Sequence, residues 1–433
     1  MLDSIFPRTV PLRQAPAKTT HINEESKKPF ILPDEILVQV TNYLLDEDES
    51  FRFSRPLLSP PKTQLMFATL CRTNKQWYRI SVPNLYANPW LYGHNYQLFV
   101  RTVCPTSNES ARRSDLARFV KQLDLRLLVH QGSISTTAQL IGRTKANLEV
   151  FRAPSSTFGV NCLVALSKCS KLQILDLSRL HAQVQFDDFV RTLSQLHKLQ
   201  ALDTPRIPRT IASSSPQAAN KEITWPPFLS KLRMSKLDGS GFLWLFFSAP
   251  RWINAYIPNT ITSLIIQDGN VEKFEMIQTL QHDVPSLKEL TLTNLNLIRG
   301  FNNVLQHAPN LERLCISINL ITAQFPVFSV EYDGNHPLKH LEIASCSGTV
   351  ELRSNPATFF SNSHLSEAVN ADQLPKLRRV DVWESAAARF RTDELDYGLL
   401  HAELVQLGIE DGFDGAGMRI IRDPGWDGMI TLT

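Results

Sequence analysis

The sequence predicts an α/β fold in which a short strand and a helix alternate many times, preceded by a small all-helical segment. A degenerate Leu-x-x-Leu-x-Leu pattern recurs ten times between residues 120 and 382. Apolar residues at helical spacing lie between several copies of that pattern, whereas residues 30–86 carry dense helix signals and no copy of it. Self-similarity at a near-constant period indicates a solenoid, because one strand and one helix cannot enclose a core alone.

The all-helical segment begins with a clear helix start. Pro33 fits the first helical position, where its missing N–H costs nothing. Asp34 and Glu35 place negative charge at the positive end of the helix dipole. The apolar residues that follow lie on one stripe, apart from one that points off it: Ile36, Val40, Tyr43 and Leu44 on the stripe, and Leu37 outside it. A helix this short cannot bury apolar residues in two directions by itself.

Two further helices complete this segment. One is expected at about 64–72, and the next contains Trp77, Tyr78 and Ile80. Three short helices make a very small core and leave aromatic and aliphatic surface uncovered. Leftover apolar surface of this kind usually marks a binding partner.

The repeats follow, and each is centred on one apolar residue. These are Leu123, Phe151, Leu175, Leu202, Leu232, Leu264, Leu290, Leu314, Leu341 and Val380. Alternating Leu-x-Leu is typical of a strand that is buried on one face only. Helices are expected at 186–196 and 271–280 between strands, and at 393 to about 407 after them. A Gly- and Asp-rich tail then runs to Thr433.

The helical segment resembles an F-box, the motif that docks a protein onto the small adaptor subunit of an SCF-type cullin-RING ubiquitin ligase. The matching elements, in order, are Leu32-Pro33-Asp34-Glu35-Ile36-Leu37, Tyr43-Leu44, Leu70-Cys71-Arg72, Trp77 and Leu85-Tyr86. Two features depart from the family pattern: residues 46–62 lengthen the first connection, and the spacing from Cys71 to Trp77 is wide. The alternative interpretation is a helical cap of a larger domain. The repeats resemble the leucine-rich repeats that often follow an F-box, so the predicted fold class is a leucine-rich-repeat solenoid.

This organisation divides the chain into four parts. They are a disordered tail at 1–28, an F-box helical domain at 29–98, a solenoid at 115–390 with an inserted loop at 205–221, and a C-terminal helix and tail at 391–433. In the solenoid, strands line the concave side and helices the convex side.

The resemblance implies a substrate receptor with two sets of binding residues. The F-box would bind the adaptor through Leu32, Pro33, Ile36, Leu37, Val40, Tyr43, Leu44, Leu70, Cys71 and Trp77. Residues that flank the central strand positions would bind a target protein, and those singled out are Asp124, Arg152, Asp176, Asp203, Lys231, Arg233, Arg313 and Arg379. The rival hypothesis is a leucine-rich-repeat scaffold that binds the adaptor outside any ligase.

Composition favours an intracellular protein, in the cytoplasm, the nucleus or both. Net charge is +3 from 45 basic and 42 acidic residues, with no long basic run, which argues against a nucleic-acid partner. The longest apolar run, 242–247, is far below the about 20 residues of a membrane span. There is no signal-peptide core at the N-terminus, and the six cysteines show no Cys-x-x-Cys spacing.

Catalytic chemistry is not indicated. The zinc, phosphate-loop and nucleophile-elbow motifs are missing, and Gly239-Ser240-Gly241 is better interpreted as a turn. His336 and His340 are four residues apart, but Pro337 argues against one continuous helix there. Residues 410–415 lack the alternating acidic ligands of a calcium loop. We therefore expect no enzyme activity, no cofactor and no metal.

Overall fold

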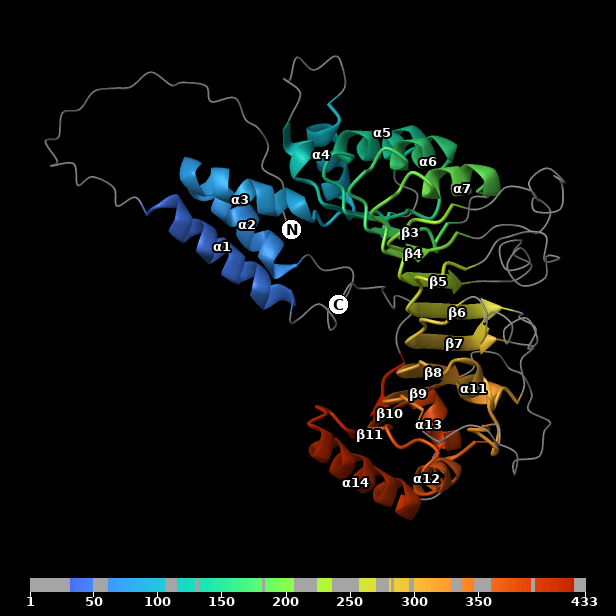
Figure 1. Cartoon of the computed structure of the whole chain (residues 1–433). Coiled ribbons are helices and arrows are strands. Elements are labelled where there is room, and N and C mark those ends of the chain that lie inside the picture. Colours follow the sequence, from blue (N-terminus) through green and yellow to red (C-terminus); the bar gives the residue numbers. More distant parts are fainter. Residues whose placement is uncertain are drawn as a thin grey trace, which may run out of the picture. The chain divides into compact units, whose positions relative to one another are not determined.

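The computed structural model consists of two compact units, Met1–Leu172 and Gln173–Thr433 (Figure 1). It describes residues 32–49, 61–105, 115–128, 132–180, 184–205, 224–235, 257–269, 280–281, 284–295, 300–328, 336–345, 360–390 and 394–423. Three expectations lie outside these residues: the tail at 1–28, nearly all of the 205–221 loop, and the apolar run at 242–247. No helix of the described residues has the length and apolarity that crossing a membrane requires.

The first unit contains helices followed by the first two repeats. Its elements are α1 (Asp34–Glu49), α2 (Lys62–Thr73), α3 (Lys75–Ala87), α4 (His94–Val103), η2 (Asp115–Phe119), β1 (Gln122–Asp124), α5 (Ile134–Thr144), β2 (Val150–Arg152) and α6 (Val160–Leu166). Helix α4 packs against α5 and η2. The expected domain boundary at residue 98 therefore falls inside a helix that belongs with the repeats.

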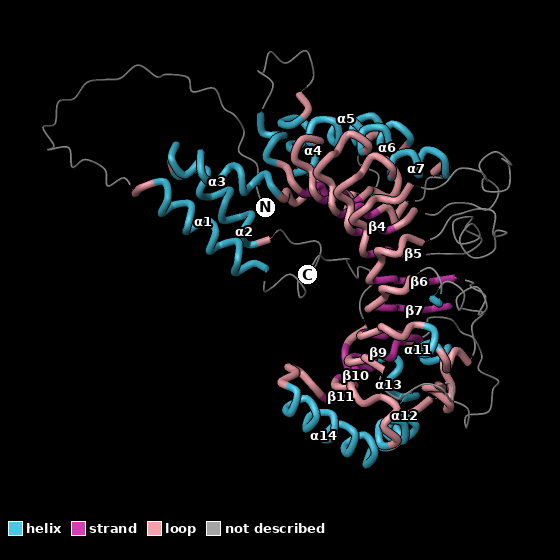
Figure 2. The backbone as a smooth tube through the Cα atoms, viewed as in Figure 1, coloured by secondary structure: helices cyan, strands magenta, loops and turns pink. Residues whose placement is uncertain are grey.

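The second unit continues the alternation of strands and helices, as Figure 2 shows. Its strands are β3 (Ile174–Asp176), β4 (Ala201–Asp203), β5 (Lys231–Ser235), β6 (Ser263–Gly269), β7 (Glu289–Leu295), β8 (Arg313–Ser317), β9 (His340–Ala344), β10 (Arg379–Trp383) and β11 (Gly417–Ile421). Its helices are α7 (Phe186–Leu193), α11 (Val304–His307), η6 (Ile318–Leu320), α12 (Asn362–Asn370), α13 (Glu384–Phe390) and α14 (Glu394–Asp411). The helix expected at 271–280 lies almost entirely outside the described residues.

Strand register confirms the predicted repeat. In the first unit, Leu123 pairs with Phe151. In the second, the central residues form one parallel row in chain order: Leu175, Leu202, Leu232, Leu264, Leu290, Leu314, Leu341 and Val380. All ten central residues are fully buried. Within each unit, each strand therefore pairs with the equivalent strand of the next repeat and buries the same position, as in a leucine-rich-repeat solenoid.

The C-terminal segment adds one more strand, which the sequence did not predict. Met418 on β11 pairs with Val380 on β10 and is buried like the central residues. Helix α14 packs on the same strand. The strand begins at Gly417, whose φ of +106° is one that residues with a side chain rarely adopt. The expected tail thus contains an eleventh repeat strand.

Local capping explains where several helices begin. The Asn74 side chain accepts a hydrogen bond of 2.9 Å from the backbone N–H of Trp77 at the start of α3. Ser133 does the same for Thr136 at the start of α5. Each cap pairs one of the N–H groups that a first helical turn leaves without an intrahelical partner.

Candidate partner-binding surfaces

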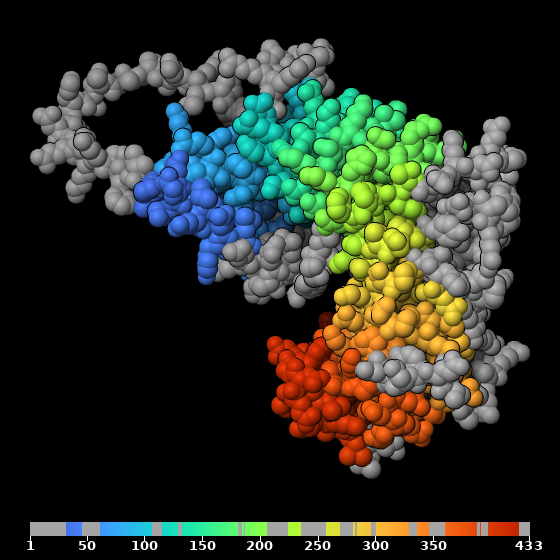
Figure 3. Space-filling view, in the orientation of Figure 1, coloured from blue at the N-terminus to red at the C-terminus, as the bar shows by residue number. Residues whose placement is uncertain are grey.

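Helix α1 exposes most of its apolar side chains. Ile36 and Val40 are each a little over 40% exposed, and Tyr43 is 65% exposed. Leu32 and Pro33, just before the helix, are also exposed. This helix lies at the surface of the first unit (Figure 3). Because soluble monomers rarely expose apolar residues in such a continuous row, α1 is a candidate interface.

The structure narrows the set of expected adaptor-binding residues. Leu37 is 1% exposed and Cys71 is 7% exposed, so both lie in the core of the helices rather than on its surface. Burial raises the pKa of the Cys71 thiol to about 11, which leaves it inert. Leu44, Leu70 and Trp77 are half-buried. Leu37 and Cys71 thus pack inside the helical core, and their expected adaptor-binding role stays a prediction.

A polar contact holds the start of α1 in place. The Gln76 side-chain amide on α3 donates to the backbone carbonyl of Leu32 at 2.7 Å and to Asp34 Oδ1 at 2.8 Å. Arg79 pairs with the other carboxylate oxygen of Asp34. These contacts cross more than 40 residues of sequence and fix the exposed Leu32 and Pro33 relative to α3. Asp34, expected to favour the start of the helix, thus also binds α1 to α3.

Sequence reasoning missed Gln64, which is buried on α2. Its side-chain N–H groups donate to the backbone carbonyls of Leu85 and Asn88, each at 3.2 Å. Its carbonyl oxygen accepts from the backbone N–H of Trp90 at 2.7 Å. One amide therefore pairs three backbone groups at the end of α3. A lone Gln in an amphipathic helix gives no sequence signal for such a role.

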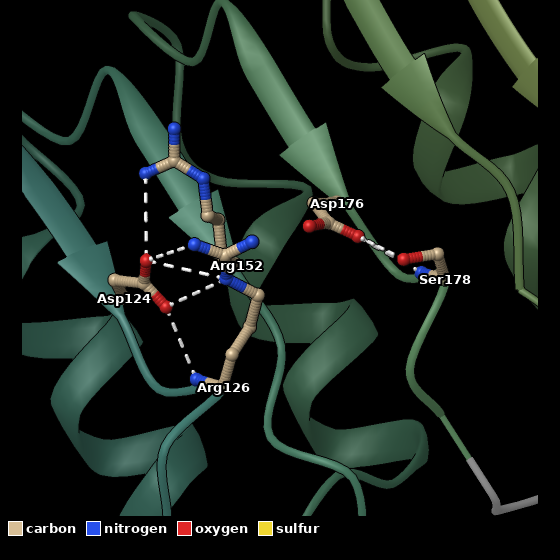
Figure 4. A network of polar contacts seen from close by, with 5 residues as sticks. All are labelled: Asp124, Arg126, Arg152, Asp176 and Ser178. Carbon is tan, nitrogen blue, oxygen red and sulfur yellow. Dashed lines mark hydrogen bonds and ion pairs between the residues drawn. The ribbon is translucent and has the colours of Figure 1, made fainter. Parts of the chain in front are cut away.

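The strand face of the first unit carries an ion-pair network (Figure 4). Asp124 accepts hydrogen bonds from the Arg126 backbone N–H at 3.1 Å and from the Arg126 guanidinium at 2.8 to 3.2 Å. Arg152 Nη1 lies 3.7 Å from the same carboxylate. Burial alone would raise the pKa of Asp124, but the two guanidinium groups outweigh it and hold that pKa below its usual value. Asp124 and Arg152 therefore bind each other.

The first strands of the second unit also carry acidic side chains that are held by polar contacts. Asp176 caps the following turn by accepting from the Ser178 hydroxyl at 2.7 Å and its backbone N–H at 3.0 Å (Figure 4). Arg233 lies 3.9 Å from Asp203 and donates to Gln267 Oε1 at 2.8 Å. The side chains of Asp203 and Arg233 are only 5% and 12% exposed. Lys231 is half-buried. Asp203 and Arg233 thus bind each other across neighbouring strands, and Asp176 binds its own turn. The target-binding role expected of these positions stays a prediction.

The last strands differ from the first ones. Arg313 Nη2 lies 2.9 Å from Glu342 Oε2, and the Trp383 indole N–H donates to Glu342 Oε1 at 2.7 Å. Arg379 Nη2 lies 2.5 Å from Asp381 Oδ2, which His340 Nε2 also contacts at 2.8 Å. Here the two arginines remain accessible, with side-chain exposures of 50% and 30%.

Side chains that could bind a metal do not cluster in the part of the chain that the structure describes. No group of three His, Cys, Asp or Glu side chains there could hold a metal ion. His336 is buried and uses both ring nitrogens: Nε2 lies 3.2 Å from the carbonyls of Leu305 and Ala308, and Nδ1 accepts from the Leu338 N–H. His340 contacts Asp381 instead. The two histidines therefore serve separate structural contacts.

Two known proteins are similar to this chain in sequence. F-box protein YDR306C of Saccharomyces cerevisiae is 26% identical over 385 residues, which cover 84% of this chain and 73% of that protein. The chain is related to an F-box protein. Protein pof5 of Schizosaccharomyces pombe is 24% identical over 321 residues, covering 72% of this chain and 83% of that protein. The name of the first relative agrees with the resemblance that the N-terminal motifs indicated. For that resemblance alone, residues 32–87 are called the F-box segment below.

No protein-family model matches the chain. Among solved structures, a leucine-rich-repeat protein of Leptospira interrogans shares 14% identity with a TM-score of 0.31, covering 62% of each chain. A plant ice-binding protein reaches a TM-score of 0.23 at the same identity, covering 55% of this chain and 79% of that one. The assignment of the repeats rests on the strand register and burial described above.

Proposed function

We propose that this chain is the target-recognition subunit of an SCF-type ubiquitin ligase. The F-box segment would dock the adaptor, and the strand face of the repeats would bind a target protein. The observation that supports this most directly is the row of exposed apolar side chains on α1, in the segment where the motifs of an F-box occur. An intracellular location, cytoplasmic or nuclear, belongs to the same proposal.

The contribution to rate would be proximity rather than chemistry. A receptor that holds its target on the ligase raises the local concentration of target lysines near the ubiquitin-charged conjugating enzyme. This role requires no catalytic side chain of the receptor itself. It requires two binding surfaces that are independently accessible, and the F-box segment and the last repeat strands each offer exposed residues.

The docking step is tested by replacing two exposed residues of α1. Ile36→Gln together with Val40→Gln removes apolar surface while keeping good helix formers. Val164→Gln on α6 is the matched control, because Val164 is an apolar residue of the same unit with 53% exposure. We expect the double variant to lose the co-purifying adaptor and cullin, and the control to retain both.

The outcomes separate the competing hypotheses. Adaptor at wild-type levels in the double variant would mean that α1 is not the docking helix. Recovery of adaptor without cullin from the wild-type chain would favour the scaffold alternative. Melting curves of both variants are compared with wild type, so that loss of binding is not confused with loss of folding.

A further inference from the structure

Three adjacent strands near the C-terminal end carry basic or titratable side chains at equivalent positions. Arg313 on β8 pairs in register with His340 on β9, which pairs with Arg379 on β10. Each precedes a fully buried central residue, so alternation along the strand directs it to the opposite face, away from the core. We call Arg313, His340 and Arg379 the cationic strip.

The counter-ions of this strip lie on the same strand face, each two residues further along β9 or β10, and are more buried than the arginines. The side chains of Glu342 and Asp381 are 9% and 2% exposed, against 50% and 30% for Arg313 and Arg379. Burial alone would raise the pKa of Asp381, but His340 and Arg379 hold it below its usual value, so the carboxylate stays ionised. In both arginine–carboxylate pairs, the cation is therefore more accessible to solvent than the anion.

The exposed groups are held in fixed positions. Glu342 engages both the Arg313 guanidinium and the Trp383 indole N–H. Asp381 engages both His340 and Arg379. Side chains already ordered in the free protein lose less entropy on binding. Arginine and tryptophan are also the residue types that most often dominate binding energy at interfaces.

The strip has boundaries that set the size of what it can bind. Glu289, exposed on β7, pairs in register with Arg313 and ends the strip on that side. Arg419, exposed on β11, is the strand-register partner of Asp381 and adds a further cation on the other side. Four strands about 4.8 Å apart span roughly 15 Å, which matches about five residues of extended peptide.

We propose that the cationic strip binds a short acidic segment of the target protein, with an anionic group on the arginines and a neighbouring apolar side chain against Trp383. The inference rests on the proposed receptor function and specifies the class of target. The alternative position for such a segment is the early strands, where Arg152 and Arg233 already pair with Asp124 and Asp203 and are mostly buried. Arg313 and Arg379 are also paired, but they keep 50% and 30% of their side chains exposed, so their greater accessibility favours β8 to β11.

The test uses the purified full-length chain and four fluorescein-labelled decapeptides. Each peptide has a central Leu flanked by Glu, by phosphoserine, by Ser or by Lys, and fluorescence anisotropy gives its affinity. We expect the Glu peptide, the phosphoserine peptide or both to bind at least tenfold more tightly than the Ser and Lys peptides. The Glu and phosphoserine arms distinguish a carboxylate from a phosphate as the recognised group.

Variants assign that binding to the strip. Arg313→Gln removes the charge at a half-exposed position and retains an amide that can donate to Glu342, so the fold is little disturbed. Lys288→Gln is the matched control, because Lys288 is exposed and ion-paired with Glu312 but lies outside the strip. We expect Arg313→Gln to weaken binding of the acidic peptide several-fold and Arg313→Lys to restore part of it, with no change in Lys288→Gln.

Two results would overturn the proposal. One is equal or absent binding of all four peptides to the wild-type chain. The other is acidic-peptide binding that Arg313→Gln and Arg379→Gln leave unchanged. Because the assay contains no adaptor, it is independent of the docking experiment on α1. Peptide binding with failed adaptor docking would refute the ligase role alone, and the reverse would refute only the cationic strip.

Discussion

Helix α1 and strand β8 use apolar residues in opposite ways. Ile36 on α1 is 43% exposed, whereas Leu314 on β8 has no exposed surface. Both belong to regular sequence patterns, yet only the strand pattern is completed within the chain. A repeat strand finds its apolar partners in the equivalent strands on either side of it. Among the residues that the structure describes, the outer face of α1 has no such neighbour, which is why we propose that it binds another molecule.

Charged residues show the same contrast between the two ends of the strand ladder. The early pairs, such as Asp203 with Arg233, are mostly buried and internally neutralised. The late pairs, such as Arg313 with Glu342, keep an exposed cation. Buried pairs of this kind fix how neighbouring strands meet, while half-exposed ones remain available for binding. Equivalent positions in a repeat therefore do not imply equivalent roles.

The largest expected effect contrasts a buried Leu with an exposed Ile. Leu314→Ala should lower the free energy of unfolding by about 3 kcal/mol, because it removes a buried side chain and leaves a cavity in the ladder. Ile36→Ala should change it by less than about 0.5 kcal/mol, as surface substitutions usually do. Chemical unfolding followed by circular dichroism measures both. A similar loss in the two variants would show that α1 packs against the chain more closely than its exposure indicates.

The sequence predicted the repeated strands well because each carries its own signal. Within each unit the central residues occupy equivalent register positions, as the Leu-x-x-Leu-x-Leu pattern indicates. The sequence did not predict β11 because Met418 stands at the central position, where most repeats have Leu, and the residues before it resemble a Gly-rich tail. The pattern of a single strand is weak, and it is pairing with β10 that makes this segment a strand.

The candidate sites were harder to predict than the fold. Helical spacing placed Ile36, Val40 and Tyr43 on one stripe correctly, and it set Leu37 apart from them. Nothing in the spacing showed that Leu37 and Cys71 would be buried, because that depends on how three helices pack. The pairing of Arg152 with Asp124 joins residues 28 positions apart. Such contacts follow from strand register, which single residues do not reveal.

A smaller effect is expected on the pH dependence of stability, through the buried side chain of His336. Burial lowers the pKa of His336, so its folded form is neutral where an unfolded His begins to gain a proton. The neutral side chain of His336 therefore stabilises the fold fully above the pKa of an unfolded His, about 6.5. This stabilisation is lost as pH falls from that value toward the lower pKa of His336 in the folded protein. Protonation would also remove the acceptor for the Leu338 N–H. We expect the melting temperature to fall between pH 7 and pH 5.

The matched variants for this pH effect are His336→Gln and His94→Gln. His94 is exposed on α4, so its replacement should leave the pH profile of the wild-type protein unchanged. His336→Gln should lower stability at pH 7 and flatten the profile between pH 7 and pH 5. If the slope persisted in His336→Gln, another group would have to be responsible for it.

The smallest effect is expected at an exposed ion-pair ladder. Glu312 lies between Lys288 at 3.3 Å and Lys339 at 3.0 Å, and all three side chains are at least 36% exposed. The hydrogen bond from Lys339 is the main cause that lowers the pKa of Glu312, so the ladder stabilises the fold above the unfolded pKa of about 4.3 and loses that contribution as pH falls through the folded pKa. Solvent screening limits such pairs, and Glu312→Gln should cost less than about 0.5 kcal/mol at neutral pH. The difference from wild type should shrink further in 1 M salt, measured by chemical unfolding. A cost comparable to that of Leu314→Ala would mean that surface charge, and not only the leucine row, holds these repeats together.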